Sequence, residues 1–163
     1  MGRAYSILFS NLTLTAATTL AAVRPPTDRG VQLIRVWLGQ NGSSTSKNFA
    51  LSIGTKASAF STLTSFTPLK LCETDPASAI TGGTAMAAGT AGINASAEGA
   101  GVYTDLAVEV MNNLNGWIWI PGPDDDISLK AGSALALCMK MLDAPTSGFQ
   151  TGWYGGMIFK EIG

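Results

Sequence analysis

Short segments in which apolar and polar residues alternate recur along this chain, and they constrain its fold more than any other feature. Residues 49–53 alternate cleanly, with Phe49, Leu51 and Ile53 on one face, which is the pattern of a half-buried strand. Turn-forming pairs such as Asn41-Gly42 separate these segments, and helical periodicity is nearly absent. The sequence therefore predicts an all-β fold, a single β-sandwich domain of jelly-roll-like type over residues 1–163.

Residues 31–38 form a segment that is apolar on both faces. Strict alternation would place Val31, Leu33 and Trp37 on one face and Ile34, Val36 and Leu38 on the other. We expect this strand to be covered on both sides. Further short strands are expected at residues 5–9, 12–14, 19–23, 69–72, 106–110, 116–120, 127–129, 134–141 and 156–162.

The stretch of residues 74–101 differs in composition from the rest of the chain. It consists almost entirely of Ala, Gly, Thr and Ser, with Ile80, Met86 and Ile93 as its large apolar residues. Such a segment cannot bury enough apolar area to offset its own ordering entropy. We expect an extended small-residue loop or arm that is ordered against a neighbour, because it contains almost no charge to keep it solvated. A mobile loop is the alternative.

The charge content limits the surroundings in which this surface is stable. Charged residues make up 13% of the 163 residues, and the net charge is −1, whereas an average soluble domain has roughly 25% charged residues. We therefore expect copies of the chain or a partner to cover much of the surface. The absence of a basic run disfavours nucleic acid as a partner. No stretch approaches about 20 uninterrupted apolar residues, so we expect no membrane-spanning helix and no membrane partner.

The chain contains two cysteines, Cys72 and Cys138, each within a short apolar run. This context predicts two buried free thiols that pack as small hydrophobic side chains. A disulfide between them is the alternative.

The residue types in this chain give little indication of a catalytic site. General acid–base and nucleophilic catalysis need a base beside a nucleophile, and the chain contains no histidine, so Ser-His-Asp and Cys-His arrangements cannot form. Ser44-Thr45-Ser46-Lys47 matches the S-x-x-K pattern, but it follows a turn instead of opening a helix. We expect no catalytic residue and no enzymatic activity.

One acidic cluster, Asp124-Asp125-Asp126, raises the question of a metal site. Carboxylates in an oxygen-rich loop bind hard cations such as calcium, yet adjacent residues point in different directions and the alternating spacing of an EF-hand loop is missing. A solvated turn is the favoured interpretation. The glycine-rich segments lack the spacing of phosphate-binding loops. We expect neither a metal site nor a cofactor.

The tryptophans lie in two of the predicted strands. Trp117 and Trp119 flank Ile118 at strand spacing, which predicts both indoles on one face, and Trp153-Tyr154 opens the last strand. Packing in the core or at a subunit interface is the favoured explanation. A carbohydrate-binding platform is the alternative.

Several segments follow one another in a characteristic order. They are Arg3-x-Tyr5, residues 31–40 ending in Gly-Gln, Phe66-Thr67-Pro68-Leu69 before Asp75-Pro76-Ala77, Trp117-Ile118-Trp119-Ile120-Pro121, and the closing residues 155–163. In pattern and order, over most of the chain, they resemble short virion proteins of tailed bacteriophages. The resemblance is greatest to the decoration (cement) proteins that bind the outside of the capsid.

That resemblance implies a β-sandwich that assembles as a homotrimer where capsid subunits meet, without performing chemistry. We expect a structural virion protein on the capsid exterior that stabilises the shell, with the major capsid protein as its partner. A lectin-like binding module and a tail or head–tail structural protein of a phage are the alternatives. The residues selected for interfaces are the large apolar ones in small-residue stretches and at the last strand: Ile80, Met86, Ile93, Trp153 and Tyr154.

Overall fold

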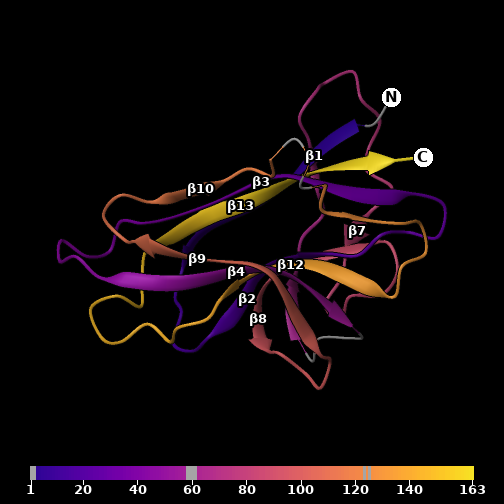
Figure 1. Ribbon diagram of the computed structural model, residues 1–163. Coiled ribbons are helices and arrows are strands. Elements are labelled where there is room, and N and C mark those ends of the chain that lie inside the picture. The colour runs from indigo at the N-terminus through magenta and orange to yellow at the C-terminus, as the bar shows by residue number, and fades with distance from the viewer. Residues whose placement is uncertain (1–2, 58–61, 123, 125) are drawn as a thin grey trace.

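The computed structural model describes residues 3–57, 62–122, 124 and 126–163. Within these residues the chain forms strands and no helix. The strands make two mainly antiparallel sheets that pack face to face as a β-sandwich (Figure 1). The prediction of an all-β sandwich is confirmed. Because the described part contains no helix, it has no helix that could cross a bilayer.

The first sheet has six strands among the described residues. Its order is β10–β3–β13–β1–β6, and β11 also pairs with β3. The bounds are β1 (Arg3–Leu12), β3 (Gly30–Gln40), β6 (Leu69–Lys70), β10 (Trp117–Trp119), β11 (Ser128–Leu129) and β13 (Trp153–Ile162). The long central strands β1, β13 and β3 therefore come from the two ends of the chain and from its first quarter.

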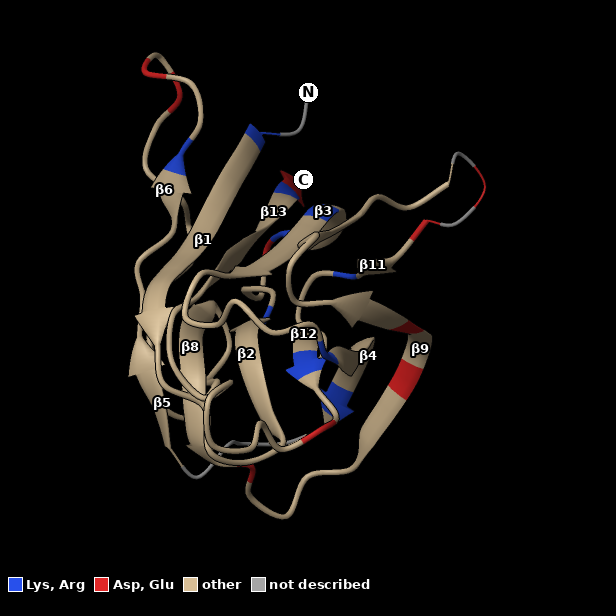
Figure 2. Ribbon diagram, turned by 90° about the vertical axis from the view of Figure 1, so that its left-hand side faces the viewer, with Lys and Arg blue, Asp and Glu red and all other residues tan. Residues whose placement is uncertain are grey.

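The second sheet has seven strands among the described residues. Its order is β5–β8–β2–β12–β4–β9, and the short β7 runs parallel to β8. The bounds are β2 (Thr18–Val23), β4 (Asn48–Ala57), β5 (Thr62–Ser65), β7 (Thr81–Gly82), β8 (Thr90–Ala97), β9 (Tyr103–Asn112) and β12 (Leu135–Met141). Figure 2 shows β9 at one end of this sheet and β5 at the other.

The core lies between the two sheets. The predicted inward residues Phe49, Leu51 and Ile53 of β4 are buried there. Phe49 packs edge-on against Trp153 of the opposite sheet, with ring centroids 5.1 Å apart and planes at 89°. An aromatic pair of this geometry adds to the stabilisation from buried area and links the two sheets.

β3 contains a bulge at Ile34 that changes the predicted division of its faces. Ile158 of β13 lies opposite Arg35, whereas Phe159 lies opposite Leu33. Ile34 is therefore an additional residue on β3. Because strand side chains alternate with a period of two, one extra residue moves every later side chain to the other face.

As a consequence, Val36 and Leu38 face the core together with Val31 and Leu33, and all four are buried. Trp37 lies on the outer face of the sheet. The prediction that Trp37 shares a face with Val31 and Leu33 is wrong, because pairing with β13 decides where the bulge forms.

Residues 74–101 are not simply a loop or arm, which corrects the expectation for this stretch. They contain β8, which pairs with β2 on one side and β5 on the other. A Cβ added at Gly92 of β8 would lie 2.8 Å from the Gly83 carbonyl oxygen and 2.9 Å from the Leu63 Cβ. The small residues of this segment therefore permit close backbone approach within the chain's own sheet.

Candidate functional site

The five residues selected for interfaces have different environments. Ile80, Met86 and Trp153 are buried within the chain itself, with 0%, 1% and 0% of their surface exposed. Ile93 is half-buried, and Tyr154 remains 38% exposed. Contacts within the chain account for the burial of these three side chains, which corrects their assignment to an interface. Ile80 and Trp153 belong to the core between the two sheets. Met86 instead packs with Leu63 and Cys138 of the seven-stranded sheet, and strand alternation does not reveal such long-range contacts.

β10 places its aromatic residues inward and its aliphatic residue outward. Trp117 and Trp119 are partly buried and pack against the core, on one face as predicted. The Trp117 Nε1 donates to Glu109 Oε2 of β9 at 2.8 Å and so joins the edges of the two sheets. Ile118 between them is 66% exposed. The two indoles on which the carbohydrate-binding alternative depended are therefore turned toward the core.

The outer face of the six-stranded sheet carries an apolar row that crosses four strands. Leu8 of β1 lies opposite Gly156 of β13, Gly156 lies opposite Trp37 of β3, and Trp37 lies opposite Ile118 of β10. Tyr154 lies two residues before Gly156 on the same face of β13. We call Leu8, Trp37, Ile118 and Tyr154 the apolar row. Leu8, Ile118 and Tyr154 are exposed and Trp37 is half-buried. Within the described chain the outer face of β3 is therefore only partly covered, although β3 was expected to be covered on both sides.

Gly156 explains how the Trp37 indole lies on this face. A Cβ at Gly156 would come within 2.8 and 2.9 Å of two carbons of the Trp37 six-membered ring, so the ring lies directly over the glycine. The Arg35 guanidinium lies 5.2 Å from the Trp37 ring centroid, within the range of a cation–π contact. The indole therefore lies between the sheet and the arginine and is half-buried.

A groove of about 560 Å³ runs beside the apolar row. Its walls are mostly apolar, and they come from β1, β3, β8, β13, β6 and the segment before β6. Ile93, one of the residues selected for interfaces, lines this groove. The other large side chains of the lining are Leu8, Phe9, Leu12, Trp37, Phe66, Leu69 and Tyr154. A flat indole beside an apolar groove provides the shape and the apolar area with which proteins bind other proteins.

A polar network on the outer face of the seven-stranded sheet has Glu98 at its centre. The Glu98 carboxylate accepts hydrogen bonds from the backbone N–H of Thr19 and from its hydroxyl, the latter at 2.9 Å. It also pairs with Lys56 Nζ at 3.5 Å and with Lys140 Nζ at 3.8 Å. The Lys56 side chain is 2% exposed and also donates to the Glu98 carbonyl oxygen. These contacts bind Glu98, which follows β8, to the strands β2, β4 and β12 of the seven-stranded sheet.

Tyr103, at the start of β9, also belongs to this network. Its ring lies 4.9 Å from Lys140 Nζ, and its hydroxyl donates to Ser52 of β4. The Ser52 hydroxyl in turn donates to the Asp105 carboxylate. Burial raises the pKa of the Tyr103 hydroxyl well above its ordinary value, so the phenol stays protonated. The side chains of this network form hydrogen bonds and ion pairs with one another. We therefore assign the network a structural role in stabilising the fold.

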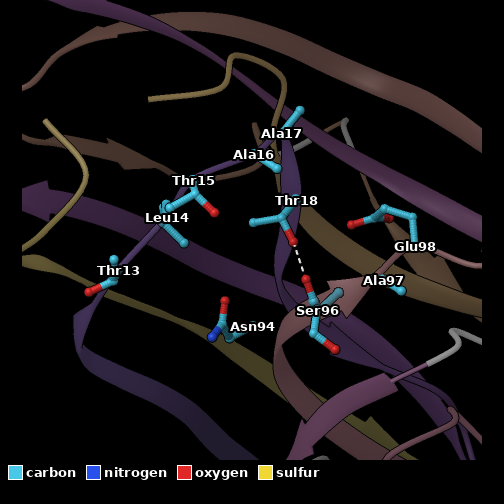
Figure 3. A pocket seen from close by; sticks show the side chains of 11 residues that line it. Thr13, Leu14, Thr15, Ala16, Ala17, Thr18, Asn94, Ser96, Ala97 and Glu98 are labelled. Carbon is cyan, nitrogen blue, oxygen red and sulfur yellow. Dashed lines mark hydrogen bonds between the residues drawn. The ribbon is translucent and has the colours of Figure 1, made fainter. Parts of the chain in front are cut away.

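A hollow of about 300 Å³ lies between the residues that lead into β2 and the end of β8 (Figure 3). Its walls are short side chains, mainly Thr, Ala, Ser and Asn. The Thr18 hydroxyl donates to the Ala95 carbonyl oxygen across it, as the dashed line in Figure 3 shows. The charged side chain in its lining, Glu98, is already held by Thr19 and two lysines. No aromatic side chain is among the lining residues, and nothing here favours a ligand.

The acidic cluster and the S-x-x-K lysine are engaged in structural contacts. Asp126 Oδ1 accepts a hydrogen bond from Gln32 Nε2 at 2.9 Å, and Asp125 lies outside the described residues. Lys47 Nζ donates to the Thr146 hydroxyl at 3.0 Å. In the part of the chain that the structure describes, no three His, Cys, Asp or Glu side chains are grouped to hold a metal ion.

The two cysteines differ in exposure. Cys138 is buried as predicted, whereas Cys72 is exposed, and both thiols are free. The prediction of two buried thiols is therefore wrong for Cys72. Cys72 follows β6 in a projecting segment and does not continue the apolar strand that the sequence predicted there.

One thiol per native chain is expected to react with a water-soluble disulfide reagent at neutral pH. A hydrogen bond with Thr74 lowers the pKa of the Cys72 thiol, and burial raises that of Cys138; the thiolate is the reactive form. Ellman titration before and after denaturation measures this, with two thiols expected in denaturant. Two reactive thiols in the native protein would contradict the burial of Cys138.

Comparisons of the chain with protein-family models, with characterised proteins and with solved structures return no match. The proposals below therefore rest on the sequence and on the geometry described here.

Proposed function

We propose that this protein is a structural virion protein that attaches to the outside of a bacteriophage capsid in several copies and stabilises the shell. In this role the apolar row contacts the major capsid protein. A ligand that binds the assembled shell, and not its separated subunits, stabilises the shell by mass action. Attachment at several symmetric sites adds avidity to each individual contact.

The observation that carries the proposal is the exposed apolar row on the six-stranded sheet. A sheet face that remains in water normally carries polar side chains, yet here Trp37, Ile118 and Tyr154 share one face beside an apolar groove. A flat indole with an arginine over it is the kind of group that dominates protein–protein binding energy. The engagement of Glu98, Lys56, Lys140 and Asp105 in structural contacts also favours a binding role over catalysis.

Charge on the same face suggests the character of the partner surface. Arg35 lies over Trp37, and Lys160 points outward from β13, whereas Glu161 points inward and is buried. The face is thus apolar and carries Arg35 and Lys160, and one carboxylate, Asp126, lies beside Gln32 opposite Lys160. A complementary surface on the capsid would be apolar, with an acidic group opposite Arg35.

Changing Ile118 to lysine is expected to weaken shell binding at least about tenfold, because a charge would be placed in an apolar contact without a partner. The measurement is co-sedimentation of the purified chain with shells assembled from the major capsid protein of the same virus. Ile118 is 66% exposed, so the substitution should leave folding intact, which far-UV circular dichroism checks.

The matched control is Val102→Lys, which changes a 72% exposed valine outside the six-stranded sheet. It should bind shells as the unchanged chain does. Failure of the unchanged chain to sediment with shells would overturn the proposed function. Equal binding by the two lysine variants would show that the apolar row is not the contact surface.

A further inference from the structure

The strand β9 ends the seven-stranded sheet with one side unpaired. Among the described residues it pairs along its length with β4 and with no other strand. Figures 1 and 2 both show it as the outermost strand of its layer. With ten residues it is far longer than β6, β10 or β5, the other end strands. An edge of this length presents a row of backbone N–H and C=O groups that another strand can pair with.

The side chains of β9 protect this edge only in part, through the charged residues Asp105 and Glu109. Natural edge strands commonly carry lysine or proline, which discourage pairing with another chain; β9 contains neither. Instead Val108 and Val110 are 54% and 66% exposed. The one irregularity is at Leu106, the additional residue between the pairs Ile53–Ala107 and Gly54–Asp105. Beyond it, residues 107–112 form a regular edge.

We propose that β9 of one chain pairs antiparallel with β9 of a second copy, joining two seven-stranded sheets into one continuous sheet across a twofold axis. This is strand addition, in which main-chain hydrogen bonds provide affinity and side chains set the register. The contact goes beyond the proposed function. It also leaves the apolar row, on the other sheet, free to contact a shell.

A second copy is the favoured occupant because the regular part of β9 is complementary to itself in a specific register. A twofold axis through Glu109 would place two carboxylates directly opposite each other, which is unfavourable. An axis through Val110 places Val110 opposite its own copy and Glu109 opposite Met111. Val108 then lies opposite Asn112, and the pairing avoids the bulge at Leu106.

Glu109 is also held away from the new contact. It accepts the hydrogen bond from Trp117 Nε1 at 2.8 Å, so its carboxylate points toward the six-stranded sheet. The outward face at the junction is then formed by Val108, Val110 and Asn112 of both copies, with the two Val110 side chains opposite each other on the axis. β-Branched side chains are favoured as cross-strand neighbours in a sheet.

The first test is the solution mass of the full chain over a dilution series, measured by sedimentation equilibrium. The mass should rise with concentration from 16.8 kDa toward twice that value. Val110→Lys places two ammonium groups opposite each other on the axis and should raise the dissociation constant at least about tenfold. Leu71→Lys changes a 53% exposed leucine near β6 and should leave the dissociation constant unchanged.

The second test is disulfide cross-linking, which remains informative if the lysine variant folds poorly. Directly opposed residues of an antiparallel pair have Cα atoms about 4.5–5.5 Å apart, a separation that a disulfide spans. With the exposed thiol removed by Cys72→Ser, Val110→Cys should form covalent dimers under mild oxidation, whereas Leu71→Cys should not.

A monomeric mass at every concentration would overturn this inference, as would a trimer whose Val110→Cys form does not cross-link. Equal self-association of Val110→Lys and the unchanged chain would also overturn it. The two proposals can fail separately, because shell binding is altered through Ile118 and self-association through Val110.

Discussion

Replacing Trp153 with alanine is expected to lower the free energy of unfolding by about 3–5 kcal/mol, the range for truncating a large aromatic side chain in a core. Trp153 has no exposed surface and packs edge-on against Phe49 of the other sheet. Its Nε1 also donates to the Phe149 carbonyl oxygen at 2.8 Å. The variant therefore loses buried area, an aromatic pair and a hydrogen bond, which urea unfolding followed by circular dichroism measures.

The neighbouring residue provides the matched control. Tyr154 lies on the opposite face of β13 and is 38% exposed, so Tyr154→Ala should cost less than about 1 kcal/mol. It should instead weaken shell binding, because Tyr154 belongs to the apolar row. Similar losses of stability in the two variants would contradict the placement of Trp153 in the core and Tyr154 on the surface.

Replacing Glu98 with alanine is expected to lower the free energy of unfolding by about 2–4 kcal/mol. The substitution removes the acceptor of the Thr19 backbone N–H and the carboxylate that pairs with the buried Lys56. Lys56 keeps its bond to the Glu98 carbonyl oxygen but loses this carboxylate, so the cost of burying its ammonium is offset less fully. Urea unfolding measures the loss.

Two further variants separate charge from hydrogen bonding at this position. Glu98→Gln keeps an acceptor oxygen for Thr19 but removes the negative charge, so its loss should be smaller than that of the alanine variant. Glu73→Ala changes an exposed glutamate and should stay within about 0.5 kcal/mol of the unchanged chain. If Glu98→Ala were as mild as Glu73→Ala, the network would not stabilise the fold.

The strands with large alternating side chains could be predicted from the sequence, and the strand with small side chains could not. β4 alternates Phe49, Leu51 and Ile53 and was correctly assigned with its buried face. β8, with the sequence TAGINASA, has little apolar pattern. Its strand conformation depends on pairing with β2 and β5, whose close approach needs small residues. Such pairing involves residues far apart in the chain, which a local pattern does not encode.

The residues predicted for interfaces also show that a local sequence pattern does not reveal long-range contacts. Ile80 and Met86 are large apolar residues among small ones, and that contrast suggested contacts with another subunit. They are instead buried within the chain, because residues 74–101 return to its own sheets. The sequence predicts a strand at Val108 and Val110 but does not mark them as interface residues, since alternation alone cannot tell an edge strand from a central one.

The sequence alone determined the class of fold, because a period of two, turn residues between short segments and the lack of helical periodicity act locally. Only the tertiary structure decided which faces remain exposed. The bulge at Ile34 turns Trp37 outward, and strand order leaves β9 at an edge. Both follow from backbone hydrogen bonds between strands that are distant in sequence, and those bonds are nearly independent of the side chains that a sequence displays.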